Sequence, residues 1–442
     1  MLSRCFLAIL VACSSNFTKK ESTINPIQPP GLSEEDQLSN ETPIAGDYGT
    51  DVIRYLATTM GATFPDTYYT FSDENTTCYD DNTDSFKSAL VDDISAVWTT
   101  KDSRYLNYVC VIDSIYNPCN QDRNRVRIYS IPEGADAQSD VGNRRAWGNG
   151  KDSGGSYNAN YDLEDPDGCD VFECSANDRI LCVISNNEPG HKGVFRYRLN
   201  FTEPGSLDLN FPVWIATYST ANIDSYNKVT ACTWIDDGVD QVEIFLCDEK
   251  GESLWAIDDD GSTYTEITWG GYVPIDVAVC VDSADVGGKV FVALASKTDR
   301  DADRIYVISV NPAWDNFSTG AYARLENSGS NQSFAFIEAI SVQKANDHDG
   351  WVLVVLLRDV QYGIGDGYGF VLRQLDFGFS DTYYRFSWDF PSPYYIQLSG
   401  AYLAESLAIG VRNRNGGSTD YYVGDRDPGM MSYDNCLHYY DN

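Results

Sequence analysis

Histidine and methionine are the scarcest chemically useful residues in this 442-residue sequence, with three and four copies. The histidines are His191, His348 and His438, and none lies beside a Gly-x-Ser-x-Gly turn. Hydrolysis by a Ser/His or Cys/His pair therefore has little support. A phosphate loop is also missing, as is a Gly-x-Gly-x-x-Gly run after a strand, so nucleotide chemistry is not expected.

Positive charge is the next deficiency. The chain has 31 Lys and Arg against 66 Asp and Glu, a net charge of −35. Nucleic acids and anionic lipid surfaces would be repelled by such a chain and are not expected as partners. The excess of carboxylates instead suits solubility outside the cell, bound cations or basic partners.

The amino-terminal apolar run, Met1–Ala12, is too short to span a bilayer and has the layout of a secretory signal. Leu10-Val11-Ala12-Cys13 resembles the lipobox of bacterial lipoproteins, in which the bond before the Cys is cut and Cys13 would carry lipid. Ser14, where Asp would be the retention residue, resembles lipoproteins that reach the outer membrane. The alternative is an ordinary signal peptide cut after Ser14. Either way we expect export, to a cell-surface or outer-membrane anchor that touches the membrane only through lipid, or into the medium.

Paired Cys-x-x-Cys motifs are missing, so a zinc site has little support. Setting aside Cys5 and Cys13 leaves ten cysteines, an even number that suggests disulfides in an exported chain. Cys280 is equally compatible with a free buried thiol. We predict a Cys110–Cys119 disulfide across a loop and a Cys232–Cys247 disulfide across a hairpin. Closure of the ring would also bring Cys78 near Cys436, and we predict a third disulfide there.

The composition along the chain predicts four structural regions. Residues 1–13 are the signal peptide, and the polar, Pro-containing stretch 14–46 is predicted to be a disordered tether. Residues 47–64 contain one short helix, Thr50–Met60, whose apolar residues keep helical spacing. Residues 65–442 read as strands and turns throughout and are predicted to form one β-domain.

Ile275–Pro312 shows the pattern most clearly, with three apolar runs joined by Gly/Asp-rich turns that predict an antiparallel meander. Its middle run, Val290–Ala295, is apolar at nearly every position, so both of its faces should be covered. Five other such sets are predicted at 93–100, 105–112 and 125–131; at 170–175, 179–185 and 193–199; at 228–235, 241–247 and 253–258; at 333–342, 351–358 and 369–377; and at 395–403, 406–413 and 419–424. A fourth, aromatic run follows most sets, at 212–218, 264–269, 322–326 and 383–388.

Repeated four-stranded units of this kind are typical of a β-propeller. We predict an all-β fold with a single propeller of about six four-stranded blades, seven being possible. Asp66–Ser72 (DTYYTFS) nearly repeats Asp381–Ser387 (DTYYRFS), and we expect this N-terminal strand to complete the last blade and close the ring. The alternatives are a β-sandwich or two stacked β-domains.

Acidic loops are the first candidate sites. Alternating carboxylates can hold Ca²⁺, which takes six to eight oxygens, although neither run matches an EF-hand. The two candidate calcium sites are Asp299, Asp301 and Asp303, and Asp162, Glu164 and Asp167. Solvated turns are the alternative for both. No cofactor other than Ca²⁺ is expected.

Aromatic residues supply the second candidates. Trp147, Tyr157 and Tyr161 lie in the Gly/Asn-rich insertion 145–161 and are the expected binding residues, with blade-to-blade packing as the alternative. In a eukaryote, the Asn-x-Ser/Thr triplets would be glycan sites, among them Asn75, Asn200, Asn316 and Asn331.

Three functions remain open. The first is a non-catalytic surface or secreted module that binds protein or glycan. The second is a glycan-active hydrolase or lyase that uses an Asp/Glu pair in the central pocket, since propeller glycosidases place such residues there. The third is a self-assembling subunit of an extracellular filament or coat.

Overall fold

The computed structural model describes residues 67–70, 78–80, 85–87, 91–99, 106–113, 126–132, 144–174, 179–200, 210–236, 239–283, 287–298, 303–311, 313–315, 317–325, 335–344, 350–359, 369–378, 384–386, 396–397, 404–411, 419–425 and 436–440. Every regular element in these residues is a β-strand. They contain no helix with the length and hydropathy to cross a membrane. The predicted signal peptide, tether and Thr50–Met60 helix lie outside them.

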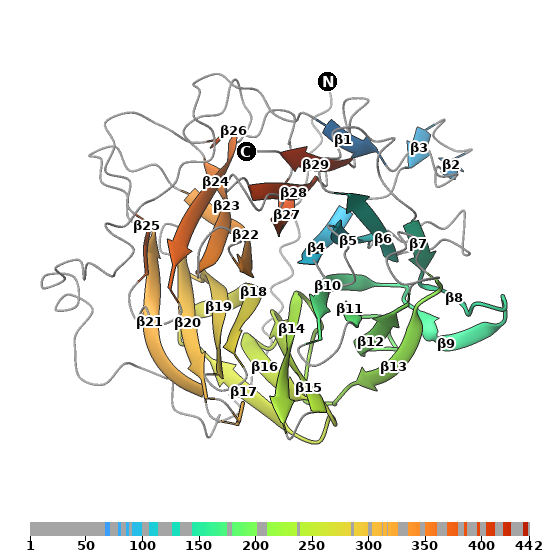
Figure 1. Cartoon of the computed structure of the whole chain (residues 1–442), viewed down its shortest axis with the longest axis horizontal. Coiled ribbons are helices and arrows are strands. Elements are labelled where there is room, and N and C mark those ends of the chain that lie inside the picture. The colour runs from blue at the N-terminus through green and yellow to red at the C-terminus, as the bar shows by residue number, and fades with distance from the viewer. Residues whose placement is uncertain are drawn as a thin grey trace, which may run out of the picture.

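Six sheets of four or five strands lie around a common centre, with one strand of each sheet nearest that centre (Figure 1). The all-β, propeller-like arrangement predicted from the repeats is therefore present. Listed from the centre outward, the first three sheets are β4 (Val91–Thr99), β5 (Leu106–Asp113), β6 (Val126–Pro132) and β7 (Arg144–Trp147); β10 (Pro166–Glu173), β11 (Ile180–Asn186), β12 (Gly193–Leu199) and β13 (Val213–Tyr218); and β14 (Val229–Asp236), β15 (Val239–Asp248), β16 (Ser253–Asp258) and β17 (Tyr264–Thr268).

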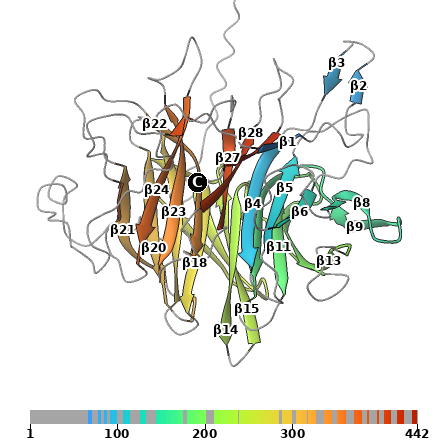
Figure 2. The same ribbon diagram turned by 45° about the horizontal axis from the view of Figure 1, so that its top comes forward.

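The remaining sheets follow the same order. They are β18 (Tyr272–Ser283), β19 (Gly287–Ser296), β20 (Arg304–Val310), β21 (Phe317–Leu325) and β25 (Tyr384–Phe386); β22 (Ala335–Lys344), β23 (Trp351–Asp359), β24 (Gly369–Phe377) and β26 (Ile396–Gln397); and β27 (Ala404–Val411), β28 (Thr419–Asp425), β29 (Cys436–Tyr440) and β1 (Thr67–Thr70). Two hairpins stand apart at the periphery (Figure 2), formed by β2 (Cys78–Asp80) with β3 (Ser85–Lys87) and by β8 (Asn149–Lys151) with β9 (Tyr157–Asp162).

The fourth sheet buries both faces of β19 because it is packed between the third and fifth sheets. In β19, Val290 and Val292 join a cluster with residues of β15 and β16, whereas Phe291 and Ala293 join a cluster with residues of β22 and β23. Successive strand residues point to opposite faces, so a strand covered on both sides must be apolar at every position. The run of apolar residues in this strand is explained by its two neighbours.

Two predicted strands are placed differently. The 395–403 segment does not open the sixth sheet; it contributes the short β26 to the outer edge of the fifth. The 383–388 run, predicted as that outer strand, supplies β25, which pairs in parallel with β21 of the preceding sheet. Local alternation predicted that both runs are extended, but pairing depends on the path of the intervening connection.

The N-terminal strand β1 pairs antiparallel with β29, aligning Thr67 with Tyr439 and Thr70 with Cys436. Strands from the two ends of the chain thus share one sheet, as the repeated DTYY sequence predicted. The last sheet begins at β27, and β29 supplies the strand that the sequence had not revealed.

Candidate functional site

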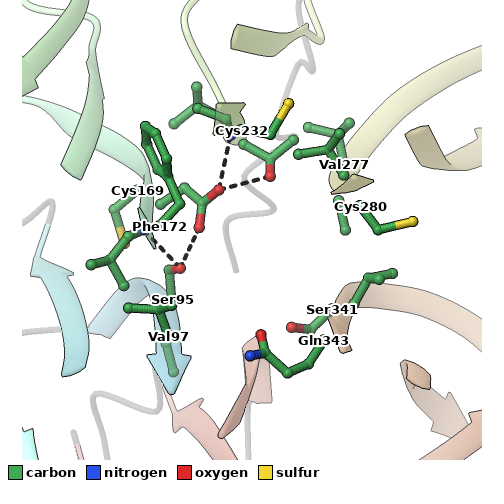
Figure 3. Close-up of a pocket in the computed structure, with 18 of the residues that line it drawn as sticks. Ser95, Val97, Cys169, Phe172, Cys232, Val277, Cys280, Ser341 and Gln343 are labelled. Carbon is green, nitrogen blue, oxygen red and sulfur yellow. Dashed lines mark hydrogen bonds between the residues drawn. The ribbon is translucent and has the colours of Figure 1, made fainter. Parts of the chain in front are cut away.

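The inner strands β4, β10, β14, β18, β22 and β27 surround a central channel with a volume of about 830 Å³. Labelled residues of five of these strands line the opening in Figure 3, among them Ser95 of β4 and Gln343 of β22. No pair of carboxylates in this channel was identified from the sequence alone.

The inner strands run in the same direction, because hydrogen bonds between neighbours step forward along both. Asp93 accepts from the backbone N–H of Cys169 at 2.9 Å, and two residues later Ser95 accepts from that of Val171 at 3.1 Å. Their carboxyl ends therefore share one mouth of the channel, and their amino ends share the other.

Three channel aspartates connect one inner strand to the next. Asp93 of β4 bonds to β10, and Asp170 of β10 accepts from Ala231 N and from Thr230 Oγ1 of β14, both at 2.8 Å. Asp276 of β18 accepts from Ile340 N of β22 at 2.7 Å. Charge-assisted hydrogen bonds of this kind hold neighbouring strands in register.

Lys228 neutralises the amino-end mouth. Its Nζ lies 2.7 Å from Asp93 Oδ1 and donates to the backbone carbonyl of Asp92 at 2.7 Å. Burial alone would lower the pKa of Lys228, but the charges of Asp93, Asp92 and Asp276 outweigh it and raise that pKa above its ordinary value. The ammonium is therefore a permanent counter-charge to the aspartates.

Burial raises the pKa of Asp170 to about 6 and that of Asp276 to about 7. It also raises the pKa of Asp167 to about 7, helped by the nearby charge of Asp92. The pairing of β4 with β5 shifts register at Asp92, and the pairing of β10 with β11 shifts register at Asp167. These bulges add carboxylates near the amino-end mouth.

The carboxyl-end mouth is polar. It is lined by Glu173 and Thr233 from β10 and β14, by Gln343 and the exposed Lys344 from β22, and by the half-buried Trp351 of β23. Lys344 and Trp351 are paired residues across the β22–β23 hairpin. One aromatic ring therefore accompanies amide, carboxylate, hydroxyl and ammonium groups at this mouth.

Of the three aromatic residues predicted to bind a ligand, two lie in the core and one lies on the surface. Trp147 is fully buried and packs edge-on against Tyr197, with ring centroids 5.5 Å apart, so its predicted binding role is wrong. Tyr161 is also a core residue, donating its hydroxyl to Pro212 O at 3.1 Å. Tyr157 alone is exposed, at 69%, and it donates to Asp162 Oδ2 at 2.9 Å.

The structure does not bring the Asp162, Glu164 and Asp167 calcium site together. Asp162 faces Tyr157, whereas Asp167 accepts from Asn187. Asp303 accepts from Ser296 N at 2.9 Å and from Ile337 N at 3.3 Å; Asp299 and Asp301 lie outside the described residues. Within the described ranges, no three His, Cys, Asp or Glu residues form a group that could hold a metal ion.

Seven cysteines with described side chains are buried free thiols, at positions 110, 169, 174, 182, 232, 247 and 280. The predicted Cys232–Cys247 disulfide is wrong, because Cys232 is opposite Glu243 in the register of β14 and β15. Cys110 is also free, 3.8 Å from the sulfur of Cys182, so the predicted bond to Cys119, itself outside the described residues, is not formed. For Cys78 and Cys436 only the backbone is described, and their pairing stays a prediction.

Of the predicted glycosylation sites named above, only Asn200 lies within the described residues. Asn200 is half-buried, and its side-chain oxygen accepts from Arg198 Nε at 3.0 Å. The structure does not describe Asn75, Asn316 or Asn331.

Comparison with known proteins adds little. No protein-family description matches the chain, and no curated protein matches its sequence. Among solved structures, an exo-β-1,3-galactanase from Phanerochaete chrysosporium is similar at 8% identity with a TM-score of 0.34, over 66% of this chain and 60% of that chain. A putative exo-β-1,3-galactanase from Bifidobacterium bifidum is similar at 13% identity with a TM-score of 0.38, over 71% of this chain and 96% of that chain. A levansucrase from Bacillus subtilis is similar at 9% identity with a TM-score of 0.40, over 74% of this chain and 93% of that chain. This chain thus spans about 60% of the length of the first galactanase, and likenesses this slight carry no argument.

Proposed function

We propose that the chain is an exported, non-catalytic binding module, a closed six-bladed β-propeller that binds a neutral glycan at the carboxyl-end mouth of its channel. The single observation that carries this proposal is the channel itself. It is preformed, with its aspartates already occupied by hydrogen bonds between strands and with Trp351, Gln343, Glu173 and Lys344 gathered at one mouth.

Closure of the ring is supported by the contacts of the inner strands. The order β4, β10, β14, β18, β22, β27 returns to β4, since β27 contacts both β22 and β4. Pairing of β1 with β29 puts an N-terminal strand at the outer edge of the last blade. A ring of this kind removes the inner sheet edges that would otherwise bind other chains.

A binding role is supported by what the channel aspartates already do. Asp93, Asp170 and Asp276 each accept backbone N–H groups from a neighbouring inner strand. A general acid or base must exchange protons with a substrate, whereas these carboxylates are occupied in holding the ring together.

A neutral glycan fits the carboxyl-end mouth. Sugars are bound by aromatic faces together with planar polar side chains, and Trp351, Gln343 and Glu173 supply both kinds of group. The net charge of −35 disfavours anionic polysaccharides. The lipobox-like sequence ending at Cys13 supports a surface anchor, and cleavage after Ser14 would instead release the chain; mass spectrometry of the mature N-terminus separates the two.

The test is isothermal titration calorimetry with a panel of neutral oligosaccharides. Replacing Trp351 by Ala should weaken binding about tenfold, since an aromatic contact is worth about 0.5–1.5 kcal/mol beyond its buried area. Trp351→Phe should retain most of the affinity. Tyr157→Ala, which removes an exposed ring from the β8–β9 hairpin, is the matched control and should bind as the wild type does.

A glycan hydrolase is the second candidate, because the raised pKa values of Asp170 and Asp276 suit a general acid. Asp170→Asn and Asp276→Asn distinguish the two proposals. The binding module predicts no oligosaccharide cleavage by wild type and changed stability in the variants. Cleavage by wild type that either substitution abolishes would establish the enzyme and reject the non-catalytic module.

A further inference from the structure

A second cavity, separate from the channel, lies beside the third sheet where the segment after β20 folds over it. It has a volume of about 310 Å³. Its floor is formed by buried residues of β15 and β16, including Glu243 and Ala256, and its rim by the exposed Asp260, Thr263 and Asp315. It is therefore a pocket that opens to solvent.

Five carboxylates line this pocket, and no Lys or Arg does: Glu243, Asp258, Asp259, Asp260 and Asp315. Asp259 is paired with Arg196, which leaves the other four without a cationic partner among the described residues. Asp258 and Asp260 each accept one backbone N–H from their own turn, and Asp315 accepts from Asn311. These bonds shape the rim without neutralising it.

Glu243 differs from the rim residues. It is 4% exposed, and within the described part of the chain its carboxyl group has no hydrogen-bond or ion-pair partner. Its register partner on β16 is Asp258, and on an antiparallel pair such partners point to the same face. A buried carboxyl group beside a second carboxylate is costly unless a cation joins them.

The wall of the pocket is aromatic. Trp234, Trp314 and Phe317 line it, and the indole N–H groups of both tryptophans are buried without a hydrogen-bond acceptor. Trp314 is 4% exposed and has a left-handed backbone with φ of 55°, an uncommon conformation for a bulky residue. The pocket thus combines negative charge with an aromatic wall.

We propose that this pocket binds a small organic cation, a primary ammonium compound, through Glu243 and Asp258 on one side and the tryptophans on the other. Aromatic rings attract ammonium groups through their negative faces. A bare metal ion is a poorer fit, because the described residues contain no group of three carboxylates that could hold one.

The experiment is calorimetric titration of the full chain with glucosamine, with cadaverine and with calcium chloride, using glucose as the uncharged analogue of glucosamine. We expect saturable binding of glucosamine and none of glucose at the same concentration. Tighter binding of cadaverine would assign the ligand to simple amines rather than amino sugars. Absence of binding by both amines at millimolar concentration, or equal binding of glucose, would overturn the proposal.

Substitution locates the binding in the pocket. Glu243→Gln removes the charge at constant volume and should weaken amine binding about tenfold or more, because hydrogen bonds to charged groups are the strong ones. Asp152→Asn, on the exposed β8–β9 turn, is the charge-matched control and should leave binding unchanged. If Glu243→Gln binds the amine as wild type does, or if Ca²⁺ competes for the same site, the pocket is not an ammonium site.

Proton release gives an independent readout. Burial, with the charges of Asp258 and Asp259, raises the pKa of Glu243 to about 9, so the free pocket is protonated at neutral pH. Binding of an ammonium ion should ionise Glu243 and release a proton. The observed binding enthalpy should then change with the ionisation enthalpy of the buffer in wild type but not in Glu243→Gln.

Discussion

At the scale of single residues, Lys228 is the group on which the charges of the amino-end mouth converge. It pairs with Asp93, and both side chains are largely buried, at 14% and 10% exposure. Removing one partner of a buried ion pair leaves the other charge uncompensated. Lys228→Met should therefore lower the free energy of unfolding by about 3–5 kcal/mol in urea denaturation.

The double variant Asp93→Asn with Lys228→Met is the control for this prediction. It removes both charges and should recover part of the lost stability. Equal loss in the single and double variants would mean that Lys228 acts through packing rather than through its charge.

Glu243 provides the second prediction at this scale. Its folded-state pKa of about 9 lies above its ordinary value of 4.5, so it contributes stability that is fully present below pH 4.5 and is lost as pH rises from there to about 9. Glu243→Gln mimics the neutral acid and removes this loss. Its melting temperature should match that of wild type near pH 4 and exceed it by several degrees near pH 9, as measured by differential scanning calorimetry. Parallel pH profiles would show that Glu243 is ionised throughout.

Predictions from the sequence were weakest for single side chains. Trp147 and Tyr157 are ten residues apart in one Gly/Asn-rich stretch, yet the first is core and the second exposed, because Trp147 ends a strand of the first sheet. The channel aspartates could have been suspected from the sequence, because Asp93, Asp170 and Asp276 each lie next to apolar residues within a strand. A charge in such a place needs a partner, but which backbone N–H groups it meets depends on the arrangement of sheets.

At the scale of elements, the β18–β19 hairpin depends on close packing at Gly288. A Cβ atom there would lie 2.2 Å from the ring of Trp314 and 2.9 Å from the backbone oxygen of Cys280. Gly288→Ala should lower the free energy of unfolding by about 1–3 kcal/mol and displace the Trp314 ring. Thermal melts measure the loss of stability. Amine titration measures the displacement of the Trp314 ring, since this ring lines the ammonium pocket.

Gly270→Ala is the matched control, because a Cβ atom at Gly270 meets nothing within 4 Å. It should be neutral or slightly stabilising, since alanine restricts the unfolded chain. If both substitutions have the same effect, the contact between Gly288 and Trp314 does not limit stability.

Strand positions were largely predictable because period-two alternation and turn residues are local signals. The predicted runs 253–258 and 193–199 coincide with β16 and β12. Pairing was less predictable: the near-identical DTYY runs both form strands, but β25 pairs with β21 whereas β1 pairs with β29. Sequence similarity between two outer strands does not determine which edge each one joins.

At the scale of the whole molecule, the buried channel acids predict the response to pH. The folded-state pKa values of Asp170, about 6, and of Asp167 and Asp276, about 7, lie above the ordinary value for aspartate. Such groups contribute stability that is present at low pH and lost as pH rises through 6 to 7. The melting temperature should therefore rise by a few degrees from pH 8 to pH 5.

Self-repulsion of a chain with net charge −35 acts in the same direction, so a variant must isolate the channel contribution. Asp276→Asn keeps an acceptor for Ile340 N while removing the titration. It should flatten the pH profile relative to wild type. An unchanged slope would assign the pH response to the surface charge.

A designed cross-link tests most directly the proposed closure of the ring by the N-terminal strand. Tyr69 and Leu437 are register partners across β1 and β29. The Tyr69→Cys, Leu437→Cys chain, oxidised with glutathione disulfide and mapped by peptide mass spectrometry, should contain the new disulfide in the folded monomer. The Tyr69→Cys, Tyr440→Cys chain is out of register and should not cross-link. Failure of the first pair to join, or equal joining of the second, would contradict closure by β1.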